Sequence, residues 1–168
     1  MGTFHTTPPT LTDGQAVSQQ FDAQGNTRIN PTGSSGSFTA QTGSGSPGAQ
    51  VTITVPAGKK WNIKSIMFQL ATDANAANRT AFLQYQNAAG AAIGQAVSGV
   101  VQTAALTYTY VFAPGIPTFT ILGPGNTVDI AINEGFLGPG MKIAISALNL
   151  QAGDVFNGVL LNVVEYPN

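Results

Sequence analysis

From residue 50 onward, the chain alternates apolar and polar residues in short runs, and glycine and proline end most of these runs. Residues 51–55 read Val-Thr-Ile-Thr-Val and are followed by Pro-Ala-Gly. In residues 107–112, Tyr108, Tyr110 and Phe112 alternate with Thr, Thr and Val, and Pro-Gly closes the run. A period of two is typical of strands with one buried face. Because no stretch repeats with the helical period of 3.6 residues, we expect an all-β fold.

The same pattern predicts eight or nine strands, over residues 51–55, 61–71, 80–86, 92–102, 107–112, 119–122, 127–132, 141–145 and 159–166. Within 61–71, the apolar residues change parity between Ile63 and Ile66, which indicates a β-bulge near Lys64-Ser65. Many short strands joined by Gly/Pro turns favour an antiparallel β-sandwich. We expect a jelly roll in residues 50–168.

Residues 1–49 have a different composition. Gly, Pro, Ser and Thr make up 27 of these 49 residues (8, 4, 6 and 9). Such a segment contains too little apolar surface to offset its own conformational entropy of about 1–2 kcal/mol per residue. The sequence therefore predicts an extended N-terminal arm over residues 1–49, ordered only in an assembly.

Charge is scarce in this protein. Charged residues make up 8% of the chain, against about 25% in an average protein, and the net charge is -1. Six basic residues give no field that would attract nucleic acid. There is no cysteine for a thiolate nucleophile or a Cys-based zinc site, and no apolar run reaches the length of a membrane span. With so little charge to prevent self-association, the chain fits best inside an assembly.

The residues needed for catalysis are also few. The single histidine, His5, lies in the predicted arm, where it is poorly held as a general base. Asp129 and Glu134 are the nearest candidates for a carboxylate pair, but polar strand and loop positions explain them better. The segment that starts at Asp73 resembles a calcium loop only in its first residues and reads better as a turn. We expect no enzyme activity, no cofactor and no metal site.

Two surface features have alternative interpretations. Lys59, Lys60 and Lys64 are half of the basic residues, and they form either a solvated strand edge or a patch that meets an acidic neighbour. The aromatic residues of 107–112 form either a platform for stacking sugars or part of the core, and the core is favoured.

Two motifs resemble those of virion proteins from tailed bacteriophages. Residues 11–15 read Leu-Thr-Asp-Gly-Gln, and 21–29 contain an Asp-x-x-Gly segment. Residues 55–66, VPAGKKWNIKSI, are similar to the strand entry of β-sandwich head-decoration and fibre-type proteins. The resemblance covers about a fifth of the chain. It implies a capsid cement (decoration) protein on the outer surface of the virion, often a homotrimer.

The sequence thus predicts a structural protein that binds and stabilises the outer capsid surface through its arm and its sandwich. Its partners would be the major capsid protein and neighbouring copies of itself. The residues expected to make these contacts are Leu11, Asp13, Phe21, Arg28, Ile29, Phe38, Lys59, Lys60 and Lys64. The alternative is a tail or fibre-base protein that binds host-surface carbohydrate, and a carbohydrate-active enzyme comes third. Copy number distinguishes the first two, because a capsid carries hundreds of copies and a tail a dozen or fewer.

Overall fold

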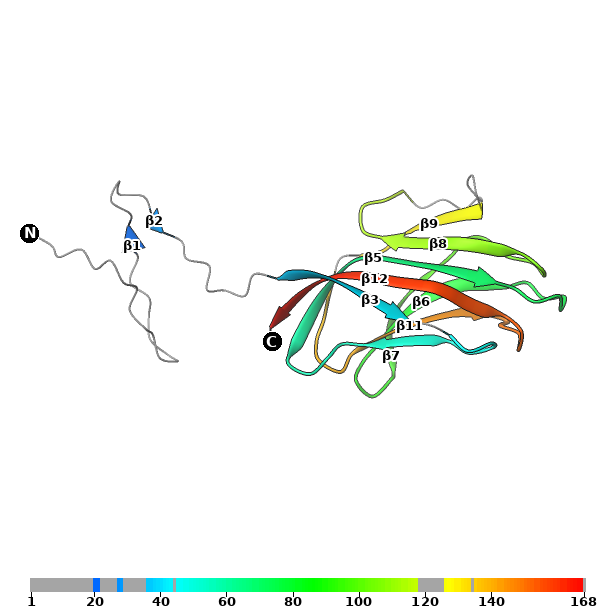
Figure 1. The fold of residues 1–168 in the computed structure, drawn as a ribbon, viewed down its shortest axis with the longest axis horizontal. Helices are drawn as coiled ribbons and strands as arrows, with labels where there is room; N and C mark the ends of the chain where they lie inside the picture. The colour runs from blue at the N-terminus through cyan, green and yellow to red at the C-terminus, as the bar shows by residue number, and fades with distance from the viewer. Residues whose placement is uncertain are drawn as a thin grey trace, which may run out of the picture. The chain divides into compact units, whose positions relative to one another are not determined.

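The computed structural model describes residues 20–21, 27–28, 36–43, 45–117, 126–133 and 135–167. The chain divides into two compact units, residues 1–33 and 34–168. In the first unit, strand β1 (Gln20–Phe21) pairs antiparallel with β2 (Thr27–Arg28). The other described strands belong to the second unit, in which they form two sheets (Figure 1).

Each sheet combines strands from the beginning and the end of this unit. The first sheet has the order β3-β12-β5-β8-β9, with β10 also paired to β5. Its strands are β3 (Ser37–Gly43), β12 (Val155–Pro167), β5 (Lys59–Ala71), β8 (Thr107–Ala113), β9 (Thr127–Ala131) and β10 (Phe136–Leu137). The second sheet has the order β4-β11-β6-β7. Its strands are β4 (Val51–Thr54), β11 (Lys142–Leu148), β6 (Thr80–Gln86) and β7 (Ala92–Val97).

The strand order is that of a jelly roll. Apart from β9 and β10, the first sheet contains the first, eighth, third and sixth strands of this unit, and the second sheet contains the second, seventh, fourth and fifth. This interleaving is that of two Greek keys whose strands are divided between two packed sheets. The predicted all-β sandwich of jelly-roll type is confirmed. An addition to it is β9, which runs parallel to β8 and forms an edge of the first sheet.

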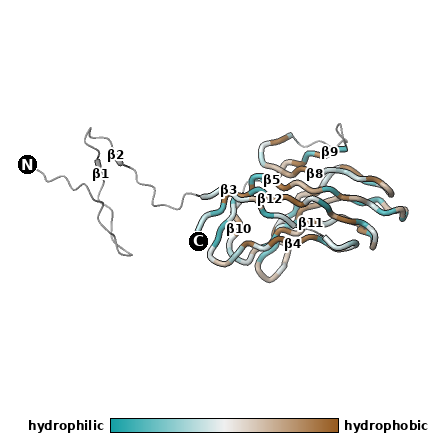
Figure 2. Tube along the Cα trace, viewed as in Figure 1, coloured by the Kyte–Doolittle hydropathy of each residue, from teal (hydrophilic) through white to brown (hydrophobic). Residues whose placement is uncertain are grey.

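The core lies between the two sheets and contains the inward-facing residues of both. Phe68 on β5 is its aromatic centre, because its ring lies 5.3 Å from that of Tyr110, 5.8 Å from Phe112 and 5.6 Å from Phe156. All four side chains are at most 1% exposed. Burial of aromatic rings in offset and edge-on pairs stabilises the sandwich through apolar area and ring geometry together. Figure 2 shows the hydrophobic segments concentrated on the central strands.

The bulge predicted near Lys64-Ser65 is present. Ser65 pairs with Asn162, whereas Ile63 pairs with Val163, so Lys64 is an extra residue on β5. The bulge lets both Ile63 and Ile66 face the core, since residues three apart on a regular strand point to opposite faces.

The sandwich begins earlier than the sequence indicated. The composition of residues 36–49 places them in the arm, but β3 pairs with β12 along its whole length, from Ser37 opposite Glu165 to Gly43 opposite Val159. The prediction that these residues belong to the arm is therefore wrong. Strand β3 has no large apolar residue on its inward face that would mark it as a strand, and its pairing with β12 holds it in the sheet. The strand expected over 92–102 ends at Val97, and the one expected over 119–122 lies outside the described residues.

Candidate functional site

The residues expected to contact a capsid lie in both units. Leu11, Asp13 and Ile29 are outside the described residues, while Phe21 and Arg28 belong to the short strands β1 and β2. Phe38 is on β3, and the three lysines, Lys59, Lys60 and Lys64, are on β5. The residues of the second unit can be compared in detail.

Strand pairing brings Phe38 into a row of residues that are far apart in the sequence. Phe38 pairs with Val164, Val164 with Asn62, and Asn62 with Phe136. Directly paired residues project from the same face of a sheet. Because the neighbouring residue on β5, Trp61, is buried in the core, the row projects from the opposite, outer face of the first sheet.

Two residues extend this row into a cluster. Tyr166 pairs with Lys60, and the ring of Tyr166 makes an edge-on contact with Phe136 at 5.8 Å. The Nζ of Lys60 lies 4.5 Å from the centre of the Phe136 ring, which is a cation–π distance. We call Phe38, Val164, Phe136, Tyr166 and Lys60 the outer-face cluster. Phe38 is 69% exposed and Phe136 52%, so both rings are available to a partner.

Beneath the cluster is a polar atom that lacks a partner. The side-chain Oδ1 of Asn62 is buried and accepts no hydrogen bond from the described residues. Buried acceptors normally have a hydrogen-bond donor as partner, so the row contains an acceptor whose hydrogen bond is missing.

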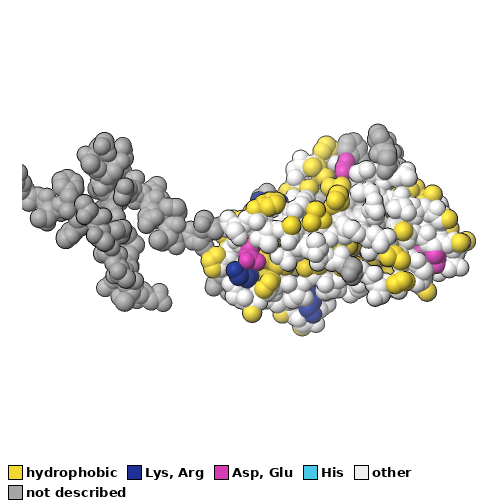
Figure 3. All heavy atoms as spheres, in the orientation of Figure 1, with side chains coloured by type: hydrophobic (Ala, Val, Ile, Leu, Met, Phe, Trp, Pro, Cys, Tyr) yellow, Lys and Arg dark blue, Asp and Glu magenta, His cyan; other side chains and the backbone are white. Residues whose placement is uncertain are grey.

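The three lysines have different surroundings. Lys59 forms an ion pair with Glu165 (Nζ to Oε1, 2.9 Å), and Trp61 Nε1 donates to Glu165 Oε2 at 2.9 Å. These two contacts, the tryptophan hydrogen bond foremost, lower the pKa of the Glu165 carboxyl. Lys60 belongs to the outer-face cluster, and Lys64 is the bulge residue. Figure 3 shows few charged side chains on the visible face of the sandwich.

Sequence reasoning selected Phe38 and Lys60 but missed Phe136, Val164 and Tyr166. Phe136 follows a loop and takes part in no alternating run. Its position beside Tyr166 depends on β10 and β12 flanking the same strand, which is a property of the topology.

The residues considered in the sequence for sugar stacking, catalysis and metal binding lie in several parts of the chain. Tyr110 and Phe112 are fully buried, which confirms that the aromatic residues of β8 belong to the core. Asp129 lies on β9, whereas His5 and Glu134 lie outside the described residues. Among the residues described, no group of three or more His, Asp or Glu is arranged to hold a metal ion. No helix there is long and apolar enough to cross a membrane.

The loop at Asp73 is a turn, as predicted, and part of a buried ionic network. Asp73 Oδ1 accepts a hydrogen bond from the backbone N–H of Asn75 at 3.0 Å. Arg79, which is fully buried, forms ion pairs with Asp73 and with the fully buried Asp154. This network joins the loop before β6 to the loop before β12.

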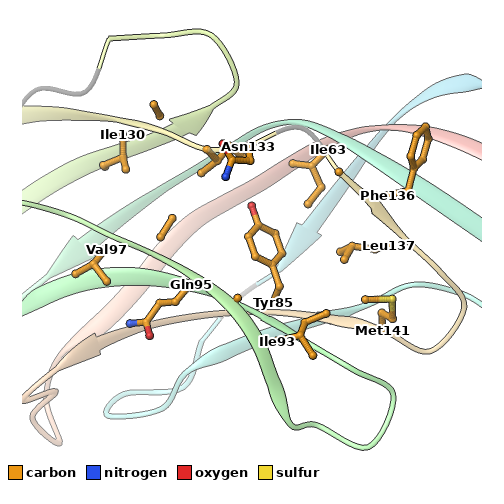
Figure 4. A pocket seen from close by; sticks show the side chains of 15 residues that line it. Ile63, Tyr85, Ile93, Gln95, Val97, Ile130, Asn133, Phe136, Leu137 and Met141 are labelled. Carbon is orange, nitrogen blue, oxygen red and sulfur yellow. The ribbon is translucent and has the colours of Figure 1, made fainter.

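A second candidate site is a pocket that opens between the two sheets. It has a volume of about 560 Å³, and its walls come from β7, the end of β9, β10 and the facing strands β5 and β6 (Figure 4). Its most distinctive polar group is the hydroxyl of Tyr85, which is buried without a hydrogen-bond partner among the described residues.

Comparisons with known proteins add little to this picture. No protein-family model matches the chain, and no curated protein matches it. Among solved structures, the chain is similar to one titled "Structure of PfGH50B", with 11% sequence identity and a TM-score of 0.34. The match covers 80% of this chain and 22% of that protein, so the chain spans about a fifth of its length. A similarity of this size carries no functional argument.

Proposed function

We propose that this chain is a non-enzymatic structural subunit that binds neighbouring protein subunits through the outer face of its first sheet. The observation that carries the proposal is the outer-face cluster, in which Phe38 and Phe136 remain 69% and 52% exposed on a protein with few charges. Aromatic residues at the centre of an interface supply much of its binding energy. Fully burying a phenylalanine contributes about 1.5–3 kcal/mol, so covering two half-exposed rings contributes roughly that amount in total.

The edge of the sheet supports the same proposal. Strand β3 is an edge strand of seven residues, SFTAQTG, without charge or proline. Natural edge strands usually carry lysine, proline or a bulge that prevents pairing with another chain. An unprotected edge beside the cluster offers backbone hydrogen bonds to a partner strand while the aromatic rings supply apolar contact.

We propose further that the assembly is a bacteriophage virion, in which the chain decorates the outer capsid surface as a cement protein. The resemblance in residues 11–15 and 55–66 supports this assignment, and jelly rolls are common in viral capsid proteins. The partners would then be the major capsid protein and other copies of this chain, arranged as a homotrimer. A tail or fibre-base location is the competing proposal.

The test is a pair of substitutions in the cluster. Phe38→Ser with Phe136→Ser removes both exposed rings and leaves the core intact, so the folded protein should bind particles at least tenfold more weakly. Leu148→Ser is the matched control, because Leu148 is 53% exposed on the second sheet. Particles produced with each variant are purified, and the chain is counted by quantitative mass spectrometry. Equal occupancy for the double variant and the control would rule out the cluster as the anchor.

A further inference from the structure

The pocket between the sheets differs from an ordinary packing defect. It has a volume of about 560 Å³, within the range of about 300–1,000 Å³ that is usual for small-molecule sites. The pocket lies where the edge strands β7 and β9 of the two sheets face each other. Ile93 and Val97 at its rim are 56% and 46% exposed, so apolar surface continues to the entrance.

Tyr85 gives the pocket its polar group. On β6, Tyr85 pairs with Gly94 of β7, so no side chain stands opposite the ring on that strand. A Cβ added at Gly94 would lie 3.4 Å from Cδ2 of Tyr85, so a larger side chain at this position would occupy the space over the ring. Figure 4 shows the ring projecting into the pocket, with its hydroxyl end directed toward the side of Ile63 and Asn133.

The hydroxyl of Tyr85 is ready to donate a hydrogen bond. It is buried and has no hydrogen-bond partner among the described residues. Burial raises the pKa of Tyr85, so the group is a protonated phenol at neutral pH. Buried polar groups without hydrogen-bond partners are uncommon in native proteins. A ligand in the pocket that accepts a hydrogen bond from the Tyr85 hydroxyl would supply the missing partner.

The residues that line the pocket indicate the chemical class of its ligand. None of the fifteen described residues that line the pocket is charged, and the polar side chains among them are Tyr85, Gln95 and Asn133. An ion would lose its hydration here without gaining a counter-charge from these residues. We infer that the pocket binds an uncharged small molecule, whose apolar body lies against Ile63, Ile130 and Met141 and whose oxygen accepts a hydrogen bond from the Tyr85 hydroxyl.

The experiment uses two probes of the same shape, 1-indanone and indane, which differ in having a carbonyl or a methylene group. Each is titrated into the full ¹⁵N-labelled chain, and binding is followed by amide shifts on β6, β7 and β9. The wild type should bind 1-indanone more tightly than indane. Tyr85→Phe should weaken 1-indanone binding about three- to tenfold and leave indane binding unchanged, because it removes one hydrogen bond.

Two variants control for other effects. Tyr108→Phe removes a hydroxyl outside the pocket and should leave both affinities unchanged. Gly94→Leu fills the space over the Tyr85 ring and should abolish binding of both probes. Equal affinities for the two probes, unaltered in Tyr85→Phe, would overturn the inference and indicate a groove for the apolar side chain of another protein. An absence of shifts up to the solubility limit of the probes would also overturn it.

Discussion

The replacement of Asp154 by asparagine should strongly destabilise the sandwich, because it removes one charge of a buried ion pair. Each carboxylate oxygen of Asp154 accepts two hydrogen bonds. Oδ1 accepts from the backbone N–H of Asp73 at 2.8 Å and from Arg79 at 2.9 Å, and Oδ2 accepts from the backbone N–H of Gln151 at 2.7 Å and from Arg79 Nε at 2.9 Å. An asparagine NH₂ in this place would turn a donor toward other donors.

The N–H donors of Arg79 all have hydrogen-bond acceptors as well, so replacing Asp154 should lower the free energy of unfolding substantially. Its five N–H groups donate to Asp154 twice, to Asp73, and to the backbone carbonyls of Asn75 and Ala77. Arg79 and Asp154 are both 0% exposed, so solvent cannot replace a lost partner. Breaking a buried ion pair by removing one charge costs about 3–5 kcal/mol, a large share of a typical total stability of about 5–15 kcal/mol.

Urea denaturation at neutral pH measures this cost. The matched control is Asp129→Asn, because Asp129 is partly exposed on an edge strand and its replacement should change the unfolding free energy by less than about 0.5 kcal/mol. A loss of less than 1 kcal/mol for Asp154→Asn, comparable to the control, would refute the argument. A second measurement separates the pair from its parts: Arg79→Leu combined with Asp154→Leu should destabilise by less than the sum of the single changes.

The pH dependence follows from the same contacts. Burial alone would raise the pKa of Asp154, but the hydrogen bonds from Arg79 and from the backbone of Gln151 and Asp73 outweigh it and lower the pKa. The native carboxyl therefore holds its proton less tightly than the unfolded one, whose pKa is about 3.9. Its contribution to stability is complete above that value and is lost as the pH falls through the lower native pKa. The difference between wild type and Asp154→Asn should shrink accordingly in acid.

Three further predictions concern other parts of the chain. Removal of residues 1–35 should leave the thermal midpoint of the sandwich unchanged, whereas removal of 1–49 also deletes β3 and should lower it and cause aggregation; equal midpoints would show that β3 contributes nothing. Replacing Lys59 and Lys64, the two lysines of β5 outside the outer-face cluster, by glutamine should leave particle binding intact, and high salt should not release the wild type, since release would mean a charge-driven contact. In an NMR titration, Lys59→Gln should raise the pKa of Glu165 toward its usual range, and an unchanged value would remove the ion pair from the explanation.

Much of the fold was predictable because most strands carry their own signal. The change of apolar parity between Ile63 and Ile66 predicts the bulge at Lys64 without knowledge of the strand pairing. In β12, alternation alone identifies the buried residues Val159, Leu161 and Val163. Such local signals exist wherever one face of a strand is buried and the other is not.

Strand β3 shows where local reasoning fails. Its only large apolar side chain, Phe38, faces solvent, and the alternate positions hold Thr39, Gln41 and Gly43. Nothing in SFTAQTG alone distinguishes a strand from a linker. The segment is a strand because β12 offers it seven partners in register, and that tertiary pairing outweighs its weak propensity.

The candidate sites depend even more on topology. Phe136 and Phe38 are about a hundred positions apart and share a row only because β3, β12, β5 and β10 are neighbours in one sheet. Tyr85 alternates like any core residue, and its sequence gives no sign that Gly94 leaves space opposite its ring. Gaps between sheets and contacts across them arise from packing and have no counterpart in the pattern of a single strand.

Hydroxyl-radical footprinting of the chain, free and in purified particles, tests the central claim most directly. Phe38 and Phe136 are exposed in the isolated protein and should oxidise readily. If the chain is a subunit that binds through the outer-face cluster, oxidation of both rings should fall severalfold in particles, while Leu148 on the second sheet should react to a similar extent in both samples. Unchanged oxidation of Phe38 and Phe136 in particles, or particles that contain no copies of the chain, would contradict the account.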